Sequence, residues 1–224
     1  MHRFCLLSMR WPLLFCFLLH APTTGHAQTK ETRRFDIAVD GDTAGSYQIT
    51  FVSGPDGTVS VTHQADVSVR RYLVVSYTYT FSGSELWKDS QLLKWDCSAN
   101  DNGTRLVTSG RRGTDGIRVT GNGHDRIVRP DIWLNTYSFK PTGQRGGQRQ
   151  AIVEADSGKE LQGLVDWVGA EERSIAGQKQ ACDHFRVRGE VQVDVWYDGQ
   201  GRLVHQESVE DGHRTVMKLT QVNR

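Results

Sequence analysis

The chain of 224 residues contains no long hydrophobic run and only four cysteines. A membrane-spanning helix needs roughly 20 consecutive apolar residues. No stretch of this sequence reaches that length, so we expect no membrane span. The 27 basic residues nearly balance the 26 acidic ones. A near-neutral protein has no general electrostatic attraction to nucleic acid, which requires a clear positive excess, so we expect no nucleic-acid partner.

The sequence also lacks the motifs of common catalytic and metal sites. It has no G-x-S-x-G turn to present a serine nucleophile and no H-E-x-x-H spacing. Its cysteines form no C-x-x-C pair, which is the usual unit of a zinc site. We therefore expect no metal and no cofactor, and we favour a protein that is not an enzyme.

Three histidines remain as candidates for acid–base chemistry. His63 stands on an otherwise apolar strand face and is predicted to be a core histidine held by a hydrogen bond. His205 and Glu207 share a strand face and could act as an acid–base pair. An envelope hydrolase is therefore a third-ranked hypothesis. It requires His184 or His205 within hydrogen-bond reach of a carboxylate in a cleft.

The first 27 residues have the three-part layout of a secretory signal peptide. Residues 1–10 carry two arginines and no acid, residues 11–19 are almost entirely apolar, and residues 21–27 end in small side chains. Cleavage after Ala27 would leave Gln28 as the N-terminus. We expect an exported protein with a signal peptide at residues 1–27 and a single β-rich domain at residues 28–224.

Two of the four cysteines belong to this leader, so Cys97 and Cys182 remain in the mature chain. Two thiols in an exported protein favour a single disulfide between them, and two buried free thiols are the alternative. Cys97 shares a strand face with Trp95, whereas Cys182 has the opposite parity to Phe185. A Cys97–Cys182 disulfide therefore requires a bulge or bend near Asp183-His184, or a Cys182 that lies in the preceding loop.

Apolar and polar residues alternate along most of the mature chain. The alternation is clearest in five segments: residues 35–39, 47–51, 59–69, 73–81 and 185–197. Period two places one face of a strand in a core and the other in water. Turn signals such as Asp101-Asn102-Gly103 separate the segments. We predict an all-β fold with little helix, namely a curved antiparallel sheet (a barrel or half-barrel) of successive hairpins. Residues 165–175 are predicted to be a strand, because Gly163 and Gly169 weaken a helix.

The final third of the chain carries a recurring type of pattern: Gly189, Asp194-Val195-Trp196-Tyr197-Asp198, Gly201-Arg202-Leu203-Val204 and Asp211-Gly212. Together with Glu85-Leu86-Trp87 and Arg129-Pro130, it resembles the signature of exported Gram-negative bacterial proteins grouped as a domain of unknown function. The resemblance implies a periplasmic location and a curved antiparallel sheet. It brings no activity and no catalytic residues.

Aromatic side chains are the most suggestive set for a binding role. The mature chain has five tryptophans: Trp87, Trp95, Trp133, Trp167 and Trp196. Tyr77, Tyr79 and Phe81 share one strand face, and with Trp95 and Trp196 they are the predicted lining of a ligand cavity. The leading hypothesis is a non-enzymatic, β-barrel-like carrier or binder of a lipid or other apolar ligand. The alternative is that these rings simply fill a core.

The second hypothesis is an envelope structural or interaction module with a solid core. Residues 105–149 carry nine basic and three acidic residues, so this middle segment could bind an acidic partner protein or anionic lipid headgroups. A solid interior would favour this hypothesis. So would the gathering of five arginines on one surface: Arg105, Arg111, Arg112, Arg118 and Arg126.

Overall fold

The computed structural model describes residues 29–71, 74–141, 147–210 and 212–224, and the expected signal peptide lies outside them. The described residues form fifteen strands: β1 (Thr29–Val39), β2 (Asp42–Ser53), β3 (Thr58–Arg71), β4 (Val74–Lys88), β5 (Gln91–Asp101), β6 (Thr104–Arg112), β7 (Ile117–Gly121), β8 (His124–Val128), β9 (Trp133–Leu134), β10 (Gln148–Val153), β11 (Glu160–Ile175), β12 (Gln178–Gly189), β13 (Val193–Tyr197), β14 (Leu203–Glu210) and β15 (His213–Asn223). Within these ranges there is no helix of the length and apolar character that crossing a membrane requires.

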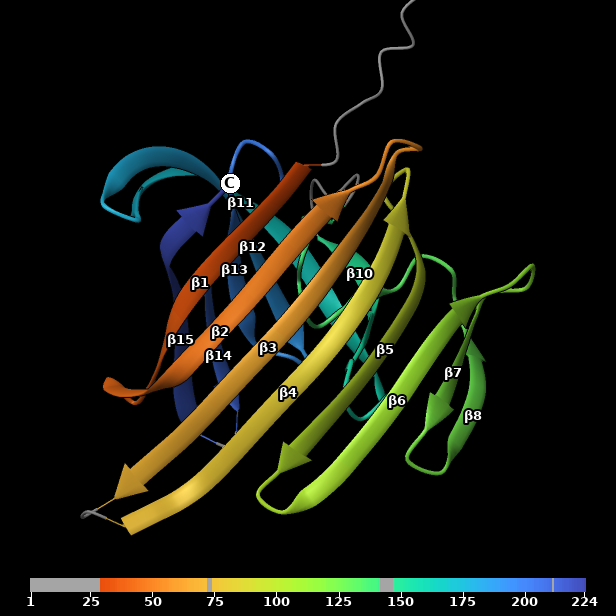
Figure 1. Cartoon of the computed structure of the whole chain (residues 1–224), viewed down its shortest axis with the longest axis horizontal. Coiled ribbons are helices and arrows are strands. Elements are labelled where there is room, and N and C mark those ends of the chain that lie inside the picture. The colour runs from red at the N-terminus through yellow and green to blue at the C-terminus, as the bar shows by residue number, and fades with distance from the viewer. Residues whose placement is uncertain (1–28, 72–73, 142–146, 211) are drawn as a thin grey trace, which may run out of the picture.

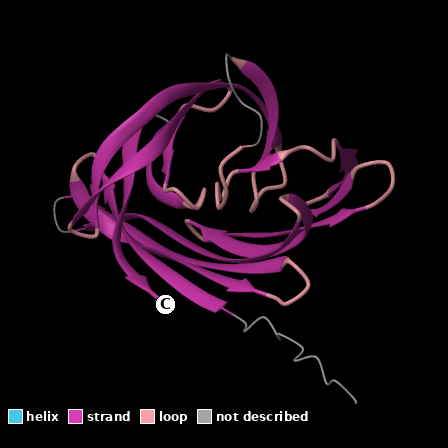
Figure 2. Cartoon of the chain, turned by 90° about the horizontal axis from the view of Figure 1, so that it is seen from above, coloured by secondary structure: helices cyan, strands magenta, loops and turns pink. Residues whose placement is uncertain are grey.

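All the strands belong to one sheet, in the order β8-β7-β6-β5-β4-β3-β2-β1-β15-β14-β13-β12-β11-β10-β9. Two meanders, β1–β8 and β9–β15, are joined along the antiparallel pair of β1 and β15. Only the short β9 runs parallel to its neighbour, β10. The sheet curls on itself but stays open, because β8 and β9 are its two edges (Figures 1 and 2). The predicted all-β fold, a curved antiparallel sheet of hairpins, is confirmed.

The strands follow the period-two pattern of the sequence. In β5, Leu92, Trp95 and Cys97 are buried on the concave face, and the residues between them are more exposed. The turn from β5 to β6 uses Asn102 and Gly103, whose φ angles are 46° and 94°. Such positive φ angles suit asparagine and glycine in tight hairpins. The predicted strand at residues 165–175 is also confirmed as part of β11.

A β-bulge in β11 reverses which face its residues occupy. Trp167 pairs with Phe185 on the concave face, but Gly169 pairs with His184 on the outer face. Inserting one extra residue shifts the alternation by one position. Glu171 therefore lies on the outer face, although the parity of Trp167 would place it inside.

The space enclosed by the sheet is occupied by the chain itself (Figure 2). Residues 129–141, here called the inner segment, lie against β4, where Thr136 Oγ1 donates to Glu85 Oε1 at 2.5 Å. The turn between β10 and β11 lies further along the concave face. Tyr79 Oη donates to Asp156 Oδ2 of that turn at 2.7 Å. The core is therefore solid along much of the sheet, and the barrel is not hollow.

The predicted Cys97–Cys182 disulfide is not formed, and both buried cysteines are free. Cys97 points to the concave side, where its Sγ lies 3.0 Å from Thr108 Oγ1 and contacts the Ala155 carbonyl. Cys182 lies on the outer face of β12, and seven strands lie between β12 and β5 in the sheet order. The strand parity that opposed this disulfide in the sequence is the physical reason that it is absent.

A buried ionic network ties the N-terminal strand to the C-terminal meander. Arg33 is 1% exposed and donates hydrogen bonds to Glu31 Oε1 at 2.7 Å and to Asp198 Oδ2 at 2.5 Å. Glu31 also accepts from Arg202 at 2.9 Å and from Arg224 at 2.7 Å. Burial alone would raise the pKa of Glu31, but these arginine hydrogen bonds outweigh it and lower the pKa to about 2. Asp198 and Arg202, which belong to the C-terminal sequence pattern, thus stabilise the contact between β1 and the C-terminal meander.

Candidate functional site

A cleft of about 1070 Å³ opens at the end of the sheet where β4 terminates. Figure 1 shows this end of β4 in its upper half. It lies between the turns β2–β3, β4–β5 and β13–β14, and the inner segment forms its floor. Five aromatic side chains line it: Trp87, Trp133, Phe139, Trp167 and Phe185. They come from β4, the inner segment, β11 and β12, so only the curl of the sheet brings them together.

The rings of the cleft are fixed by their own contacts. Trp133 Nε1 donates to the Phe139 carbonyl at 3.1 Å. Phe139 meets Trp87 edge to face, with 5.0 Å between ring centroids. Trp167 and Phe185 are cross-strand partners on the concave face. Trp167 is 39% exposed, so part of its side chain stays accessible to a ligand.

Trp87 is anchored by a buried polar network behind the cleft. Its Nε1 donates to Glu85 Oε2 at 2.6 Å, and His63 Nε2 lies 2.9 Å from Glu85 Oε1. Tyr47 Oη lies 2.7 Å from His63 Nδ1. Burial would raise the pKa of Glu85, but His63 and the hydrogen bonds from Thr136 and Trp87 hold it below its usual value. His63 is 1% exposed, and the prediction of a hydrogen-bonded core histidine is confirmed.

This network contains a serine, a histidine and a carboxylate, but its geometry is not that of a hydrolase triad. Ser138 Oγ lies 3.4 Å from His63 Nε2, the same nitrogen that contacts Glu85. In a triad the acid and the serine use opposite ring nitrogens. Here the second nitrogen faces Tyr47, and all four side chains are buried. The network therefore fastens the inner segment to β3 and β4.

The predicted ligand-lining residues occupy other places. None of the five is among the residues that line the aromatic cleft: Tyr77, Tyr79, Phe81, Trp95 and Trp196. Tyr77 is 36% exposed, and Phe81 is buried beside the parallel ring of Tyr79. Trp95 is 1% exposed and lies flat on Gly110 of β6. Trp196 faces outward, on β13.

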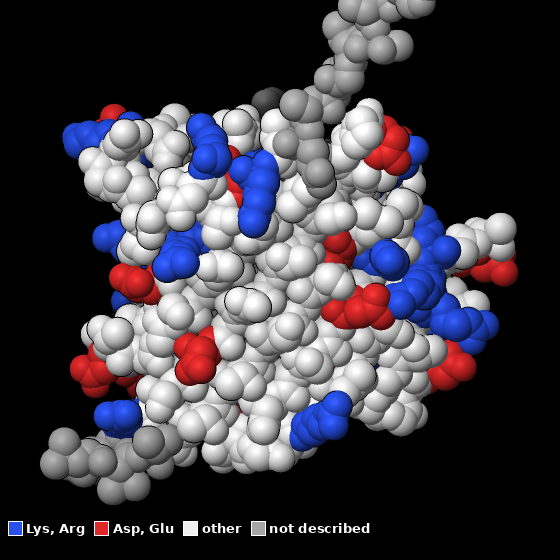
Figure 3. Space-filling view, in the orientation of Figure 1, with Lys and Arg blue, Asp and Glu red and all other residues white. Residues whose placement is uncertain are grey.

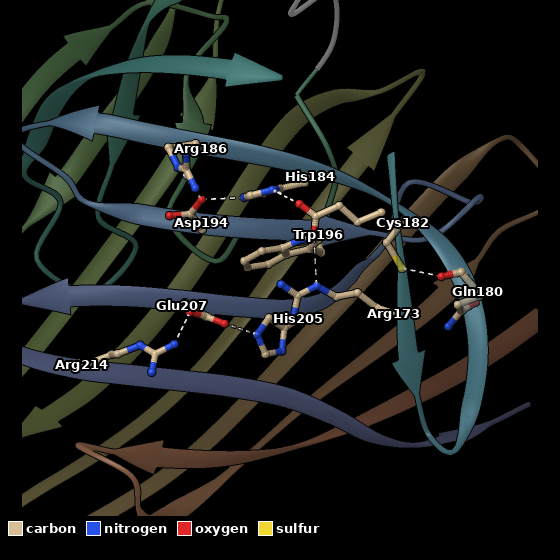
Figure 4. Close-up of polar contacts among 11 residues, drawn as sticks. Arg173, Gln180, Cys182, His184, Arg186, Asp194, Trp196, His205, Glu207 and Arg214 are labelled. Carbon is tan, nitrogen blue, oxygen red and sulfur yellow. Dashed lines mark hydrogen bonds and ion pairs between the residues drawn. The ribbon is translucent and has the colours of Figure 1, made fainter. Parts of the chain in front are cut away.

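Trp196 is the centre of a second cluster, on the outer face of the C-terminal meander (Figure 4). Its ring is stacked between His184, at a centroid distance of 4.2 Å, and the guanidinium of Arg173, at 3.8 Å. His184 Nδ1 lies 2.7 Å from Glu171, and Nε2 lies 2.6 Å from Asp194. The end of the β11–β12 hairpin thus folds back over the sheet and covers the Trp196 ring, which is 3% exposed.

His205 completes this outer cluster on β14. Its Nε2 lies 2.9 Å from Glu207 Oε1, and its ring meets Trp196 edge to face at 4.9 Å. Burial of the ring lowers the pKa of His205 below its usual value, although the hydrogen bond to Glu207 opposes this. The neutral imidazole is therefore favoured at neutral pH.

The outer cluster supplies the contacts that an envelope hydrolase would need, but no activated nucleophile. Both ring nitrogens of His184 face carboxylates, Glu171 and Asp194, so neither is directed at a nucleophile. Cys182 Sγ on the same strand face is 3.6 Å from the Gln180 carbonyl. Burial raises the pKa of this thiol, which opposes the thiolate form that attacks substrates. The contacts of the outer cluster instead hold the β11–β12 hairpin against β13.

The basic middle segment does not present one cationic surface. Figure 3 shows basic side chains over β6–β8 with acidic ones beside them. On the outer face, Arg111 pairs with Asp96 at 2.5 Å and Arg118 pairs with Asp125 at 2.8 Å. Arg112 and Arg126 lie on the opposite face. Arg112 donates to the Leu92 carbonyl and Arg126 to that of Gly158.

The fold defines an open, β-barrel-like protein with a filled interior. The chain belongs to the family described as a domain of unknown function, DUF6134, whose model matches residues 35–220. The expectation of an uncharacterised family is thereby confirmed. No curated protein matches the chain.

Among solved structures, the chain is similar to a β-barrel-like protein of the domain of unknown function DUF1849 from Brucella abortus. The TM-score is 0.61 at 6% sequence identity, and the match covers 87% of this chain and 97% of that one. At this identity the likeness concerns the fold alone.

Proposed function

We propose that this protein is an exported, periplasmic, non-enzymatic binding protein whose aromatic cleft holds a small ligand with an apolar face. The observation that carries the proposal is the meeting of aromatic rings from three distant parts of the chain, namely β4, the inner segment and the β11–β12 hairpin, in one open cleft. Small-molecule sites are typically concave and mostly apolar, with a few polar groups that orient the ligand. Aromatic rings supply much of the contact area in such sites.

The rigidity of the rings supports a binding role. Trp87 is held through its Nε1 by buried Glu85, and Trp133 is held through its Nε1 by the backbone of Phe139. Neither ring must be ordered when a ligand enters, so the entropic cost of binding is reduced. Rings that only stabilise the fold would be expected to be fully buried. Trp167 is instead 39% exposed.

We thus propose the ligand site at the cleft at the end of the sheet and not in a hollow barrel, where the leading hypothesis had expected a lipid or other apolar ligand. The inner segment and the β10–β11 turn fill the concave side further along, where Tyr79 bonds Asp156. At the cleft, by contrast, the partly exposed rings of Trp87 and Trp167 border open space. The second hypothesis, a partner bound through the basic middle segment, has less support because those arginines point to two faces.

A fluorescent apolar dye such as N-phenylnaphthylamine tests the binding proposal. We expect the dye to bind with enhanced emission, and the Trp167→Ala variant to bind it about tenfold more weakly, since a large exposed ring is lost. Leu164→Ala is the matched control, because Leu164 is 41% exposed on the same strand but on the outer face. Absence of dye binding, or equal binding by both variants, would refute the proposal.

The periplasmic location is proposed from the signal-peptide layout of residues 1–27. Expression of the full chain in a Gram-negative host should yield a periplasmic protein whose first residue is Gln28, as N-terminal mass spectrometry would show. A cytosolic protein that retains Met1 would contradict this part of the proposal. The proposed location and the proposed binding function are independent, because no residue of the expected signal peptide lines the cleft.

A further inference from the structure

We propose that the ligand of the aromatic cleft is an uncharged oligosaccharide. This inference rests on the proposed binding function and adds the chemical class of the ligand. A pyranose ring has one face of C–H groups that packs on an aromatic ring, and a rim of hydroxyl groups that both donate and accept hydrogen bonds. A matching site needs exposed rings together with polar groups that have no partner of their own.

The cleft has the first feature on both of its sides. Trp87 comes from the N-terminal meander and Trp167 from the C-terminal one, and each leaves part of its ring uncovered. Trp133 and Phe139 of the floor lie between them in the lining. Rings on two walls and a floor suit a chain of sugar units, each of which offers a flat apolar face.

The cleft has the second feature along its rim. The side-chain amides of Gln91, Gln148 and Gln200 line it, and none of the three has a hydrogen-bond partner among the described residues. Each amide offers two donors and one acceptor oxygen, which match the mixed character of hydroxyl groups. A bare acyl chain in the same place would remove these amides from water without giving them a partner, which is unfavourable.

The charges of the lining favour an uncharged ligand. Three basic and three acidic side chains line the cleft: Lys88, Arg112, Lys140, Asp89, Asp131 and Asp183. Lys140 and Asp183 also neutralise each other directly at 3.0 Å. A site for a phosphate or a fatty-acid carboxylate would be expected to have a cationic excess, and this one has none.

The size of the cleft favours an oligosaccharide over a single sugar. Pockets for small molecules typically enclose roughly 300–1,000 Å³, and this cleft of about 1070 Å³ is slightly larger than that range. Its open mouth allows a chain to enter and leave at its ends. A cleft of this kind would hold a few sugar units of a longer envelope glycan.

Calorimetric titration with neutral malto-, cello- and chito-oligosaccharides tests the inference, with palmitate as the lipid probe. We expect at least one oligosaccharide to bind and palmitate not to compete with it. Gln148→Leu and Gln200→Leu each remove an amide but keep its bulk, and each should weaken saccharide binding about three- to tenfold. Gln64→Leu, on the outer face of β3, is the matched control.

The outcomes separate the two proposals. Dye binding that depends on Trp167, without binding of any of the three oligosaccharides, would overturn the saccharide inference and leave the binding function intact. Saccharide binding that is insensitive to both glutamine variants would also overturn it. Absence of dye binding would refute the binding function itself, and the saccharide inference with it. Saccharide binding that is weakened by the Trp167→Ala, Gln148→Leu and Gln200→Leu variants would support both.

Discussion

The buried carboxylate of Glu31 gives the sharpest test of how this sheet is held together. Glu31 receives hydrogen bonds from three arginines, and its side chain is 7% exposed. The Glu31→Gln variant keeps the size of the side chain and removes its charge. We expect a substantial loss of stability at neutral pH, because Arg33 would stay buried with one carboxylate fewer.

The magnitude follows from the pKa of the carboxyl group. Lowering it from 4.5 to about 2 corresponds to roughly 3 kcal/mol, since each pKa unit is worth about 1.4 kcal/mol. A depressed carboxyl pKa stabilises the folded state above the unfolded value of 4.5, and this contribution is lost as the pH falls towards 2. For a chain of this size, roughly 3 kcal/mol corresponds to a melting temperature lower by about 6–12 °C.

Urea unfolding followed by tryptophan fluorescence measures this effect. The free-energy difference between the wild type and Glu31→Gln should be largest at pH 7 and should shrink between pH 4.5 and about 2. Glu172→Gln is the control: Glu172 lies on β11, 3.1 Å from Lys179, with its side chain 65% exposed. It should change stability by less than about 1 kcal/mol. A difference for Glu31→Gln that is small, or constant over the acidic range, would refute the reasoning.

Three further outcomes are expected. Gly110→Ala would place a Cβ 1.9 Å from a ring atom of Trp95 and should cost about 3 kcal/mol or more in thermal unfolding, whereas Gly199→Ala meets no atom within 4 Å and should be nearly neutral. Because burial lowers the pKa of His205 below 6.5, the unfolded chain binds that proton first as the pH falls. The wild type should therefore lose stability as the pH falls below 6.5, and His205→Gln should lose less; equal losses would contradict the burial argument. Burial raises the pKa of Cys97 to about 12, so iodoacetamide should label it only after denaturation. If the denatured mature chain contained no free thiols, the predicted Cys97–Cys182 disulfide would be present after all.

Much of the fold could be predicted from the sequence, because the relevant information lies between neighbouring residues. The alternation at residues 59–69 became most of β3, and Asn102-Gly103 became a turn with positive φ. The burial of His63 also followed from its place on an apolar strand face. Each of these inferences needed only the geometry of one strand or one turn.

The aromatic cleft could not be predicted in the same way. The sequence favoured the rings of Tyr77, Tyr79 and Phe81, because three aromatic residues alternate there on one face. The cleft instead uses Trp87, six residues beyond Phe81 in β4, and Trp167 of β11, which is 80 positions further along the chain. Strand parity shows which face a ring occupies but does not show which distant turn it meets.

The sequence by itself determined that this chain forms strands and where most of them turn. It also determined that Cys97 lies on the apolar face of its strand and Cys182 on the opposite face of its own. The tertiary structure alone decided that the sheet stays open, that residues 129–141 fill it, and that a mixed aromatic and polar cleft remains at one end. The reason is physical: strand periodicity is fixed by covalent geometry over a few residues. The curl of fifteen strands depends on bulges, such as the one in β11, and on packing between segments that the chain order keeps far apart.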